Sequence, residues 1–492
     1  MAKILFILRT PELYDPVGVI SLAATLKSKG HEADIVSVSE TDVFRAAGDF
    51  SPDIVAYSAT TGSHRYYYSL NRSLAARYRF FSVMGGPHAT FFPQDQPASG
   101  MDAFCRGEGE GALVELAEHV QAGADPGGIR NLVVAGKANP LRPLIEDLDS
   151  LPFSDRSEYY ERAWVRDHPV RSFIVSRGCA YACPYCFNSK WNEMYRGLGA
   201  VLRRQSVDRV IDEVNLVRRR YPTQFIRFND DVFAYGNTTR WLDEFAGKYR
   251  ARVGLPFECY MRCEDVTHET ARLLRKAGCR SVRMGIECGD AGIRARLLAR
   301  PVGDDRILDA FVTVRQHGLV PVSSTMLALP GGAESTDEES VRFTVRARPG
   351  FADFYIYHPY PGTPLGEYAR EQGIFEGDFQ SFSAYFGSTP SPLKCFSPGR
   401  KRRQMLLSAW GTVAAYAPAW SEFILACLSR IPSQFLGFLL YFAVKVLANR
   451  RISPVRMPVW RALRQLANAF RLERDRRYAR ANPRSGSLGF RF

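Results

Sequence analysis

Short apolar runs alternate with amphipathic stretches along the first 140 residues. The amphipathic stretches Val17–Lys29 and about Gly111–Ala122 repeat their apolar positions at helical spacing, whereas the apolar runs are short enough for buried strands. Strands that alternate with helices are typical of a parallel sheet covered by helices. The pattern predicts a Rossmann-like α/β domain over residues 1–140. Its strands are expected at KILFIL (3–8), EADIVSV (32–38), DIVAYSA (53–59) and FFSVMGG (80–86).

A second alternating series extends over residues 168–375. Six strand-like runs separated by helical stretches predict a partial (βα)6 barrel. Residues 125–165 have little periodicity and four prolines, which predicts a linker, placed at residues 141–167. Strand signals stop near residue 375, so residues 376–492 are expected to be mainly helical. The six runs are SFIVS (172–176), FIRFND (225–230), FECYMR (257–262), SVRMGIE (281–287), SSTMLAL (323–329) and FYIYHPY (354–360).

The charge of the chain is concentrated near its C-terminal end. The formal net charge is +14, and residues 396–492 alone hold 18 Lys and Arg against 3 Asp and Glu. The rest of the chain shows no basic face, zinc finger or aromatic-basic motif, so we expect no nucleic-acid partner. Ten Cys in 492 residues are too sparse for a disulfide scaffold, and the first apolar run lacks a cleavage pattern. These features predict a cytoplasmic location.

The strongest chemical signal is the run Cys179-Ala-Tyr-Ala-Cys183-Pro-Tyr-Cys186. Three thiolates at these spacings can converge on one iron–sulfur cluster from a single loop, and three ligands leave one iron of a [4Fe-4S] cluster open. The alternative is a structural zinc site, but zinc needs four ligands and no second CxxC or His pair lies at the required spacing. The pattern predicts Cys179, Cys183 and Cys186 as cluster ligands with a catalytic role.

This motif resembles the CxxxCxΦC pattern of the radical S-adenosylmethionine (SAM) superfamily, with Tyr185 at the aromatic position. The resemblance extends to later strand ends, where FNDD ends with Asp230 and Asp231, CYMRCED contains Arg262, and GIE contains Glu287. It implies that Tyr185, Asp230 or Asp231, Arg262 and Glu287 contact SAM.

Each of these assignments has a structural alternative. Arg262 could pair with Glu264 or Asp265, and acidic residues at strand ends often cap helices. The seven Cys outside the motif are expected to be buried, as free Cys commonly is.

Glycine-rich segments follow three strands of the N-terminal domain, where an open α/β sheet binds its ligand. They read SATTGS (58–63), VMGGPHAT (83–90) and CRGEGEG (105–111). Their order resembles the cobalamin-binding domain of the radical SAM branch that includes methyltransferases and the anaerobic magnesium-protoporphyrin cyclase. The resemblance implies cobalamin contacts from Thr60, Thr61, Gly62, Gly85, Gly86, Pro87, His88, Gly107, Glu108 and Gly109.

The DxHxxG motif that supplies an axial His to cobalt in other cobalamin proteins is absent here, since the first turn reads LRTPELYDPVG. His64 and His88 remain candidates for the cobalt side. Alternatively, each is a solvent-facing or turn-capping His.

The resemblance implies a reaction that begins when the reduced cluster cleaves SAM to methionine and a 5′-deoxyadenosyl radical. The radical abstracts hydrogen from an unactivated carbon, methylcobalamin delivers a methyl group, and a second SAM restores the methyl group on cobalamin. An external electron donor such as flavodoxin or ferredoxin is then required. Two alternatives stay open: a cyclase or rearrangement enzyme without net methyl transfer, and a cobalamin-responsive binding or regulatory protein. The intact Cys motif argues against the second.

Residues 404–447 contain strongly apolar helical stretches. In the second stretch, the uncharged run Ile431–Val444 has 14 residues, fewer than the roughly 20 that cross a bilayer. Basic residues and tryptophans surround it, as in helices that lie in a membrane surface. The alternatives are a helical cap on the barrel and a peripheral membrane contact through residues 404–492, at the inner face of the membrane. The second would favour a lipid-like substrate over another small molecule.

Overall fold

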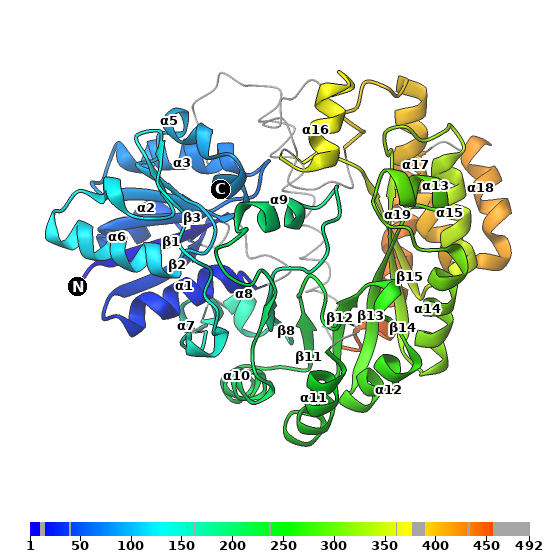
Figure 1. The fold of residues 1–492 in the computed structure, drawn as a ribbon, viewed down its shortest axis with the longest axis horizontal. Helices are drawn as coiled ribbons and strands as arrows, with labels where there is room; N and C mark the ends of the chain where they lie inside the picture. The colour runs from blue at the N-terminus through cyan, green and yellow to red at the C-terminus, as the bar shows by residue number, and fades with distance from the viewer. Residues whose placement is uncertain are drawn as a thin grey trace.

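The structure is a computed structural model of the 492-residue chain, and it describes residues 1–9, 15–38, 41–154, 156–161, 163–235, 238–360, 362–375, 389–430 and 433–455. Figure 1 shows two sheets side by side, with the N-terminal sheet on the left and the second sheet towards the right. The C-terminal helices lie at the far right, beyond the second sheet.

The N-terminal sheet has seven strands in the order β2-β1-β3-β4-β5-β6-β7. Strands β1 to β5 pair in parallel, and β6 and β7 add an antiparallel edge. Helices α1 and α6 cover one face and α2 and α3 the other, so apolar strand residues are buried on both sides. The strands are β1 (Lys3–Leu8), β2 (Glu32–Ser37), β3 (Ile54–Ser58), β4 (Phe81–Gly85), β5 (Ala103–Cys105), β6 (Leu132–Val134) and β7 (Lys137–Ala138); the helices are α1 (Val17–Ser28), α2 (Val43–Phe50), α3 (His64–Ala75), α4 (Gly86–Phe91), α5 (Gln96–Ser99) and α6 (Glu110–Ala122).

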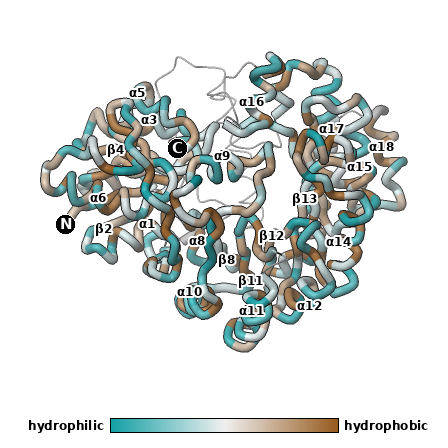
Figure 2. Tube along the Cα trace, viewed as in Figure 1, coloured by the Kyte–Doolittle hydropathy of each residue, from teal (hydrophilic) through white to brown (hydrophobic). Residues whose placement is uncertain are grey.

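The second sheet has six parallel strands in the order β15-β14-β13-β12-β11-β8, so each strand lies beside the next one along the chain. It forms an open half-barrel with helices on its outer side, which confirms the predicted fold class (Figure 1). Figure 2 shows polar positions over outer helices such as α10 and α11 and apolar positions along the strands. The strands are β8 (Val170–Phe173), β11 (Phe225–Phe228), β12 (Phe257–Met261), β13 (Cys279–Glu287), β14 (Val320–Leu327) and β15 (Phe351–Ile356); the helices are α10 (Val207–Arg220), α11 (Thr239–Arg252), α12 (His268–Ala277), α13 (Ala291–Arg296), α14 (Asp304–Gln316), α15 (Thr336–Ala347) and α16 (Pro364–Glu371).

The first predicted barrel strand is divided in two. β8 ends at Phe173, and β9 (Ser176–Arg177) pairs instead with β10 (Arg203–Arg204) in a two-stranded sheet. The division arises because the Asp230 carboxylate accepts the backbone N–H groups of Val175 and Ser176, which therefore leave the strand ladder. The resulting hairpin carries the Cys motif away from the sheet edge.

The chain between the two sheets forms short helices and buried polar contacts. Asp15, at the start of α1, accepts hydrogen bonds from the backbone N–H of Ser172 at 2.7 Å and from the Tyr160 hydroxyl at 2.6 Å. Arg156 is buried between Asp15 and Glu213, 3.3 and 3.6 Å from their carboxylates. These contacts join the first turn of the N-terminal sheet to the first barrel strand. The short helices are α7 (Ser157–Tyr160) and α8 (Ala163–Arg166).

Of the three C-terminal helices, α17 (Pro398–Tyr416) and α19 (Gln434–Ile452) pack on the last barrel strand, β15, and α18 (Ser421–Arg430) packs on α17. The Thr412 hydroxyl of α17 donates to the Ala352 carbonyl, and Tyr441 of α19 donates to Asp353. The helices therefore cover the open edge at β15. Within the described ranges, we find no helix with the length and apolar character needed to cross a bilayer. Residues 431, 432 and 456–492, which belong to the predicted basic region, lie outside the described residues.

Candidate functional site

The Cys motif occupies a loop between β9 and α9 (Phe187–Met194) at the mouth of the half-barrel. Cys179 is buried, whereas Cys183 and Cys186 are half-buried. The Cys186 backbone N–H donates to the Cys183 carbonyl at 3.0 Å and closes a turn. Gly178 has a φ of +82°, and a Cβ there would lie 1.9 Å from the Val201 carbonyl oxygen. Only glycine lets the hairpin approach this closely just before the first Cys.

The triad suits a cluster better than a single small ion. Burial is the main cause that raises the pKa of Cys179, and it raises the pKa of Cys186 to about 12. Negative charge on neighbouring thiolates acts in the same direction, so the deprotonated triad needs a strongly positive ligand. The three thiols are not gathered within 4.8 Å of one another. Thiolates around one zinc ion would be only about 4 Å apart.

Asp230 and Asp231 have different environments although they are adjacent in sequence. Asp230 is 2% exposed, and its Oδ1 accepts hydrogen bonds from the backbone N–H groups of Val175 and Ser176 and from the Ser176 hydroxyl. Asp231 is exposed and lies close enough to Cys179 and Cys186 that its charge raises their pKa values. Asp230 therefore lies beneath the Cys loop, and Asp231 faces the triad.

Arg262 reaches the Cys loop from the end of β12. Its Nη1 donates to Cys183 Sγ at 3.0 Å and its Nη2 to Glu264 at 2.6 Å, and its guanidinium lies 3.7 Å above the Tyr181 ring. The pairing with Glu264 that the sequence left open is therefore present, together with a direct contact to the motif. Asp265, the other candidate partner, accepts from the Tyr181 hydroxyl at 2.8 Å instead.

Arg300 extends this network and was not identified from the sequence. It is almost fully buried and donates to Glu264 at 2.8 Å, to Glu287 at 3.2 Å and to the Gly285 carbonyl at 3.1 Å. Burial, and after it the Glu287 charge, raise the pKa of Tyr185 well above its usual value. Two arginines and two glutamates thus form a continuous ionic network beside the triad. The loop that holds Arg300, LLARPVG, matches no motif that marks this role.

The three glycine-rich segments meet at the carboxyl ends of the parallel strands β3, β4 and β5. Thr60, Thr61 and Gly62 follow β3, and α4 begins at Gly86, directly after β4. Gly86 has a φ of +88°, and a Cβ there would lie 2.9 Å from the Ala59 carbonyl oxygen. The backbone of this turn therefore lies against the end of β3, and Gly85, Pro87 and Gly109 belong to the same edge.

His64 and His88 are buried side by side at this edge, so neither faces solvent. Their rings stack at 3.9 Å with an interplanar angle of 13°. His88 contacts the Thr61 hydroxyl at 3.3 Å and the Tyr68 hydroxyl at 2.9 Å, and burial lowers the pKa of His88 to about 3. His64 caps a turn by accepting the Gly62 backbone N–H at 3.1 Å. The nitrogens of both rings and the Asp95 carboxylate lie within 4.8 Å of one another, but stacked parallel rings do not direct their lone pairs to one point.

The third segment contacts the hairpin that precedes the Cys loop. Glu108 lies 3.0 Å from Arg177 and 2.9 Å from Arg203, and Glu110 lies 2.6 Å from Arg177. Gly107 has a φ of +71°, and a Cβ there would lie 1.7 Å from the Tyr195 hydroxyl at the end of α9. The Glu108 side chain, expected to contact cobalamin, is therefore directed at the β9–β10 hairpin.

Two family models match the chain. The B12 binding domain matches residues 5–117, and the Radical SAM superfamily matches residues 173–344. The first covers most of β1 to the end of β5, and the second covers the Cys motif and the barrel strands from β11 to β14.

Among curated relatives, the uncharacterized methyltransferase PH0819 of Pyrococcus horikoshii is 28% identical over 368 residues, which are 72% of this chain and 78% of that protein. The anaerobic magnesium-protoporphyrin IX monomethyl ester cyclase of Rubrivivax gelatinosus is 25% identical over 380 residues, 72% of this chain and 66% of that one. Among solved structures, the cobalamin-dependent SAM radical enzyme OxsB with aqua-cobalamin and SAM bound has a TM-score of 0.68 at 12% identity, covering 96% of this chain and 75% of that one. This last likeness establishes the fold.

Proposed function

This chain belongs to the radical SAM enzymes that carry a B12 binding domain, and on that basis we propose that it methylates an unactivated carbon of a small-molecule or lipid-like substrate. Its cofactors are a [4Fe-4S] cluster, SAM and cobalamin. When bound, the cluster supplies the electron that cleaves SAM, and cobalamin supplies the methyl carrier. An external donor such as flavodoxin or ferredoxin supplies the electron to the cluster.

The observation that carries this proposal is the contact between the two cofactor-binding edges. Arg177, two residues before Cys179, is held by Glu108 and Glu110 of the segment that follows β5. This contact fixes the carboxyl edge of the N-terminal sheet against the mouth of the half-barrel. Methyl transfer needs that arrangement, because the methyl carrier and the site of hydrogen abstraction must meet the same substrate atom.

We assign the remaining roles from the geometry of the mouth. Cys179, Cys183 and Cys186 hold the cluster. Arg262, which already reaches Cys183 Sγ, binds the SAM carboxylate, and Asp231, which faces the thiols, binds the SAM amino group.

The neighbouring network supports these contacts. Glu264 and Arg300 orient Arg262 and Glu287, and Tyr185 lies beside Glu287 where the nucleoside of SAM would bind. The turns at Thr61, Gly86 and His88 receive cobalamin. Because Glu108 is committed to two arginines, the segment Gly107–Gly109 contributes backbone rather than carboxylate contacts.

The test is anaerobic reconstitution with iron, sulfide and cobalamin, followed by incubation with SAM, a reductant and candidate substrates. Methyl transfer produces S-adenosylhomocysteine together with 5′-deoxyadenosine, and deuterated SAM methyl groups enter the product. Protein that holds the cluster but never cleaves SAM would contradict the proposal.

A second candidate is a cobalamin-dependent cyclase, favoured by the relative from Rubrivivax gelatinosus. The same assay distinguishes it, since a cyclase forms 5′-deoxyadenosine and modified substrate without S-adenosylhomocysteine.

We further propose that the C-terminal helices contact the surface of an anionic membrane, which would favour a lipid-like substrate. α19 buries Val444, Ala448 and Ile452 against the barrel and Gly437 against α17, and it leaves apolar side chains on its outer face. Phe435 is 69% exposed, and Trp420 and Phe423 of the preceding turn and α18 are exposed to a similar degree. Large apolar groups gathered on a surface mark an interaction site.

The charge at the end of α19 indicates which partner fits this face. Lys445, Arg450 and Arg451 are exposed on the same helix, and the chain beyond it is rich in arginine. Each basic side chain near an anionic leaflet contributes about 1 kcal/mol to binding. An apolar helix face with basic residues beside it is typical of helices in a membrane surface.

Sedimentation with anionic and neutral liposomes, at low and high salt, tests the contact. The full chain should sediment with anionic liposomes, less at high salt, and Phe435→Ser with Leu439→Ser should release it. Val312→Ser, on α14, is the matched control because its side chain is also exposed and apolar. A chain that stays in the supernatant, or a stable dimer that buries this face, would contradict the proposal.

A further inference from the structure

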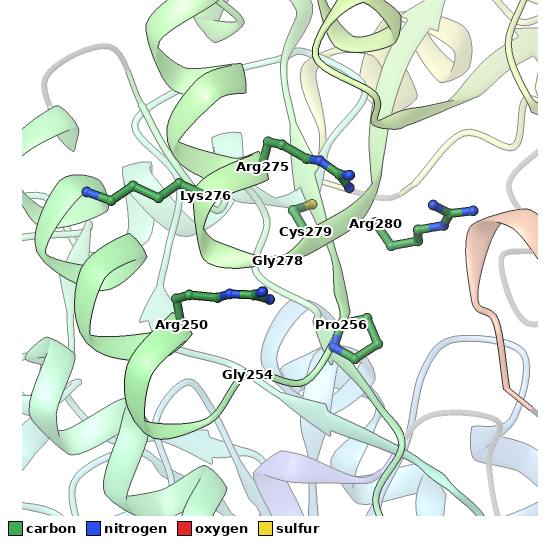
Figure 3. Close-up of a pocket in the computed structure, with 8 residues that line it drawn as sticks. All are labelled: Arg250, Gly254, Pro256, Arg275, Lys276, Gly278, Cys279 and Arg280. Atoms are coloured by element: carbon green, nitrogen blue, oxygen red, sulfur yellow. The ribbon is translucent and has the colours of Figure 1, made fainter.

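A basic cavity lies at the end of the half-barrel opposite the Cys loop. It has a volume of about 380 Å³ and lies where β12 and β13 begin. Four lining side chains are basic, those of Arg250, Arg275, Lys276 and Arg280, and none is acidic (Figure 3). A cavity with this lining attracts anions.

Two of these guanidinium groups are available to a ligand. Arg250, near the end of α11, and Arg275, near the end of α12, are exposed, and Figure 3 shows their guanidinium groups on either side of Gly278. Among the described residues, neither forms an ion pair with a carboxylate. Lys276 is directed the other way and pairs with Asp243 at 3.2 Å.

Basic residues in the last turn of a helix also offset the negative end of its dipole. That role is already filled at α11, where Arg218 donates to the Val253 carbonyl at 2.6 Å and to the Arg252 carbonyl at 3.2 Å. At α12, the Gly278 backbone N–H caps the Arg275 carbonyl. Helix capping therefore does not explain why Arg250 and Arg275 face one cavity without a carboxylate between them. Their mutual repulsion is relieved when an anion binds.

The cavity adjoins the end of α19. Arg280 Nε donates to the Arg451 carbonyl at 2.7 Å, and the Ser281 hydroxyl donates to the Ile452 carbonyl at 3.2 Å. The last turn of α19, with exposed Arg450 and Arg451, therefore lies on the strand that forms one wall of the cavity. Basic side chains thus continue from the cavity to the apolar helix face.

We propose that this cavity binds the phosphate group of an anionic phospholipid while the outer face of α19 contacts the membrane. The inference rests on the membrane contact proposed above and names its headgroup site. Guanidinium groups bind phosphate oxygens through paired N–H donors, so Arg250 and Arg275 together hold one phosphate group from two sides. The apolar face of α19 attaches the protein to the membrane, and the cavity makes binding stronger to membranes that contain anionic lipid.

The test compares the full chain with the double variant Arg250→Gln, Arg275→Gln. The matched control is Arg240→Gln, Arg272→Gln, which removes the same charge from exposed positions of the same two helices. Vesicles of phosphatidylcholine alone and with phosphatidylglycerol are the probes. Removing two arginines that contact the headgroup should weaken binding to the anionic vesicles about thirtyfold, while the control loses only a few-fold. Unchanged circular dichroism and cluster iron content exclude misfolding.

The other outcomes separate the two proposals. Equal losses in the double variant and the control would overturn the headgroup site and leave the membrane contact standing. Failure of the unaltered chain to bind any vesicle would overturn both. A separate experiment measures the binding of inorganic phosphate to the chain without vesicles. If phosphate binds tightly through Arg250 and Arg275, and anionic vesicles do not displace it, the site binds soluble phosphate and the lipid assignment is wrong.

Discussion

Replacing Asp230 with Asn tests whether this carboxylate supports the Cys loop rather than binding SAM. Burial raises the pKa of Asp230 from 3.8 to about 6. Asn retains the oxygen that accepts from Val175 and Ser176 and removes the charge. The loop should therefore keep its position, while the dependence of stability on pH should change.

The magnitude follows from the shift in pKa. About two pH units correspond to roughly 3 kcal/mol between the two protonation states. Because the folded-state pKa is above the unfolded-state pKa, stability is full below pH 3.8 and is lost as the pH rises through about 6. The unfolding free energy of the unaltered chain should therefore fall by about 1–2 kcal/mol more than that of Asp230→Asn between roughly pH 5 and 8.

The absolute stability is less informative than this difference. Asp230 Oδ2 has no hydrogen-bond partner among the described residues, so the new amide group costs about 1–3 kcal/mol at every pH. Anaerobic urea unfolding of the full chain at several pH values measures the difference directly. A variant whose stability follows that of the unaltered chain at each pH would refute the buried, ionising carboxylate.

Asp231→Asn is the matched control for Asp230→Asn, because it makes the same chemical change at the next residue of the chain. It should raise the KM for SAM about 10- to 100-fold, the value of a lost charged hydrogen bond, while Asp230→Asn leaves it near normal. The reverse result, with the cluster intact in both variants, would exchange the two roles.

Three further substitutions test other parts of the site. Cys183→Ala should lose cluster iron and SAM cleavage. Cys259→Ala should keep both, because the Cys259 thiol is buried on β12 and not in the Cys loop. Full turnover by Cys183→Ala would contradict the cluster assignment. Glu110→Gln breaks the ion pair between Glu110 and Arg177, which are 2.6 Å apart, and it should raise the ratio of 5′-deoxyadenosine to methylated product several-fold. Glu118→Gln, at an exposed position of the same helix, should leave this ratio unchanged. Equal ratios in the two variants would show that the Glu110–Arg177 contact does not couple the two cofactors. Gly86→Val places a Cβ 2.9 Å from the Ala59 carbonyl oxygen at a residue whose φ is +88°. Bound cobalamin, measured by its absorbance, should therefore be lost while cluster iron remains. A normal cobalamin content would show that cobalamin does not bind at this turn.

Much of the architecture could be predicted because it depends on short-range patterns. Apolar runs that alternate with helical stretches gave both parallel sheets, and the strand ends then located the glycine-rich turns and the Cys loop. The prediction of a single strand over residues 172–176 was wrong because Asp230, more than fifty residues away, takes the N–H groups of Val175 and Ser176. Hydropathy carries no information about such a distant acceptor.

The sequence by itself determined the kind of chemistry, because the spacing of Cys179, Cys183 and Cys186 acts within one loop and each glycine-rich segment acts in the turn after one strand. Only the tertiary structure decided which side chains meet. It separated Asp230 from Asp231, directed Glu108 to Arg203 across 95 residues of chain, and brought Arg300 into the ionic network beside the triad. The physical reason is that a pattern along the chain determines the local conformation and which face of an element is buried. The partner of a charged side chain depends instead on how distant elements pack, and that packing is a property of the whole fold.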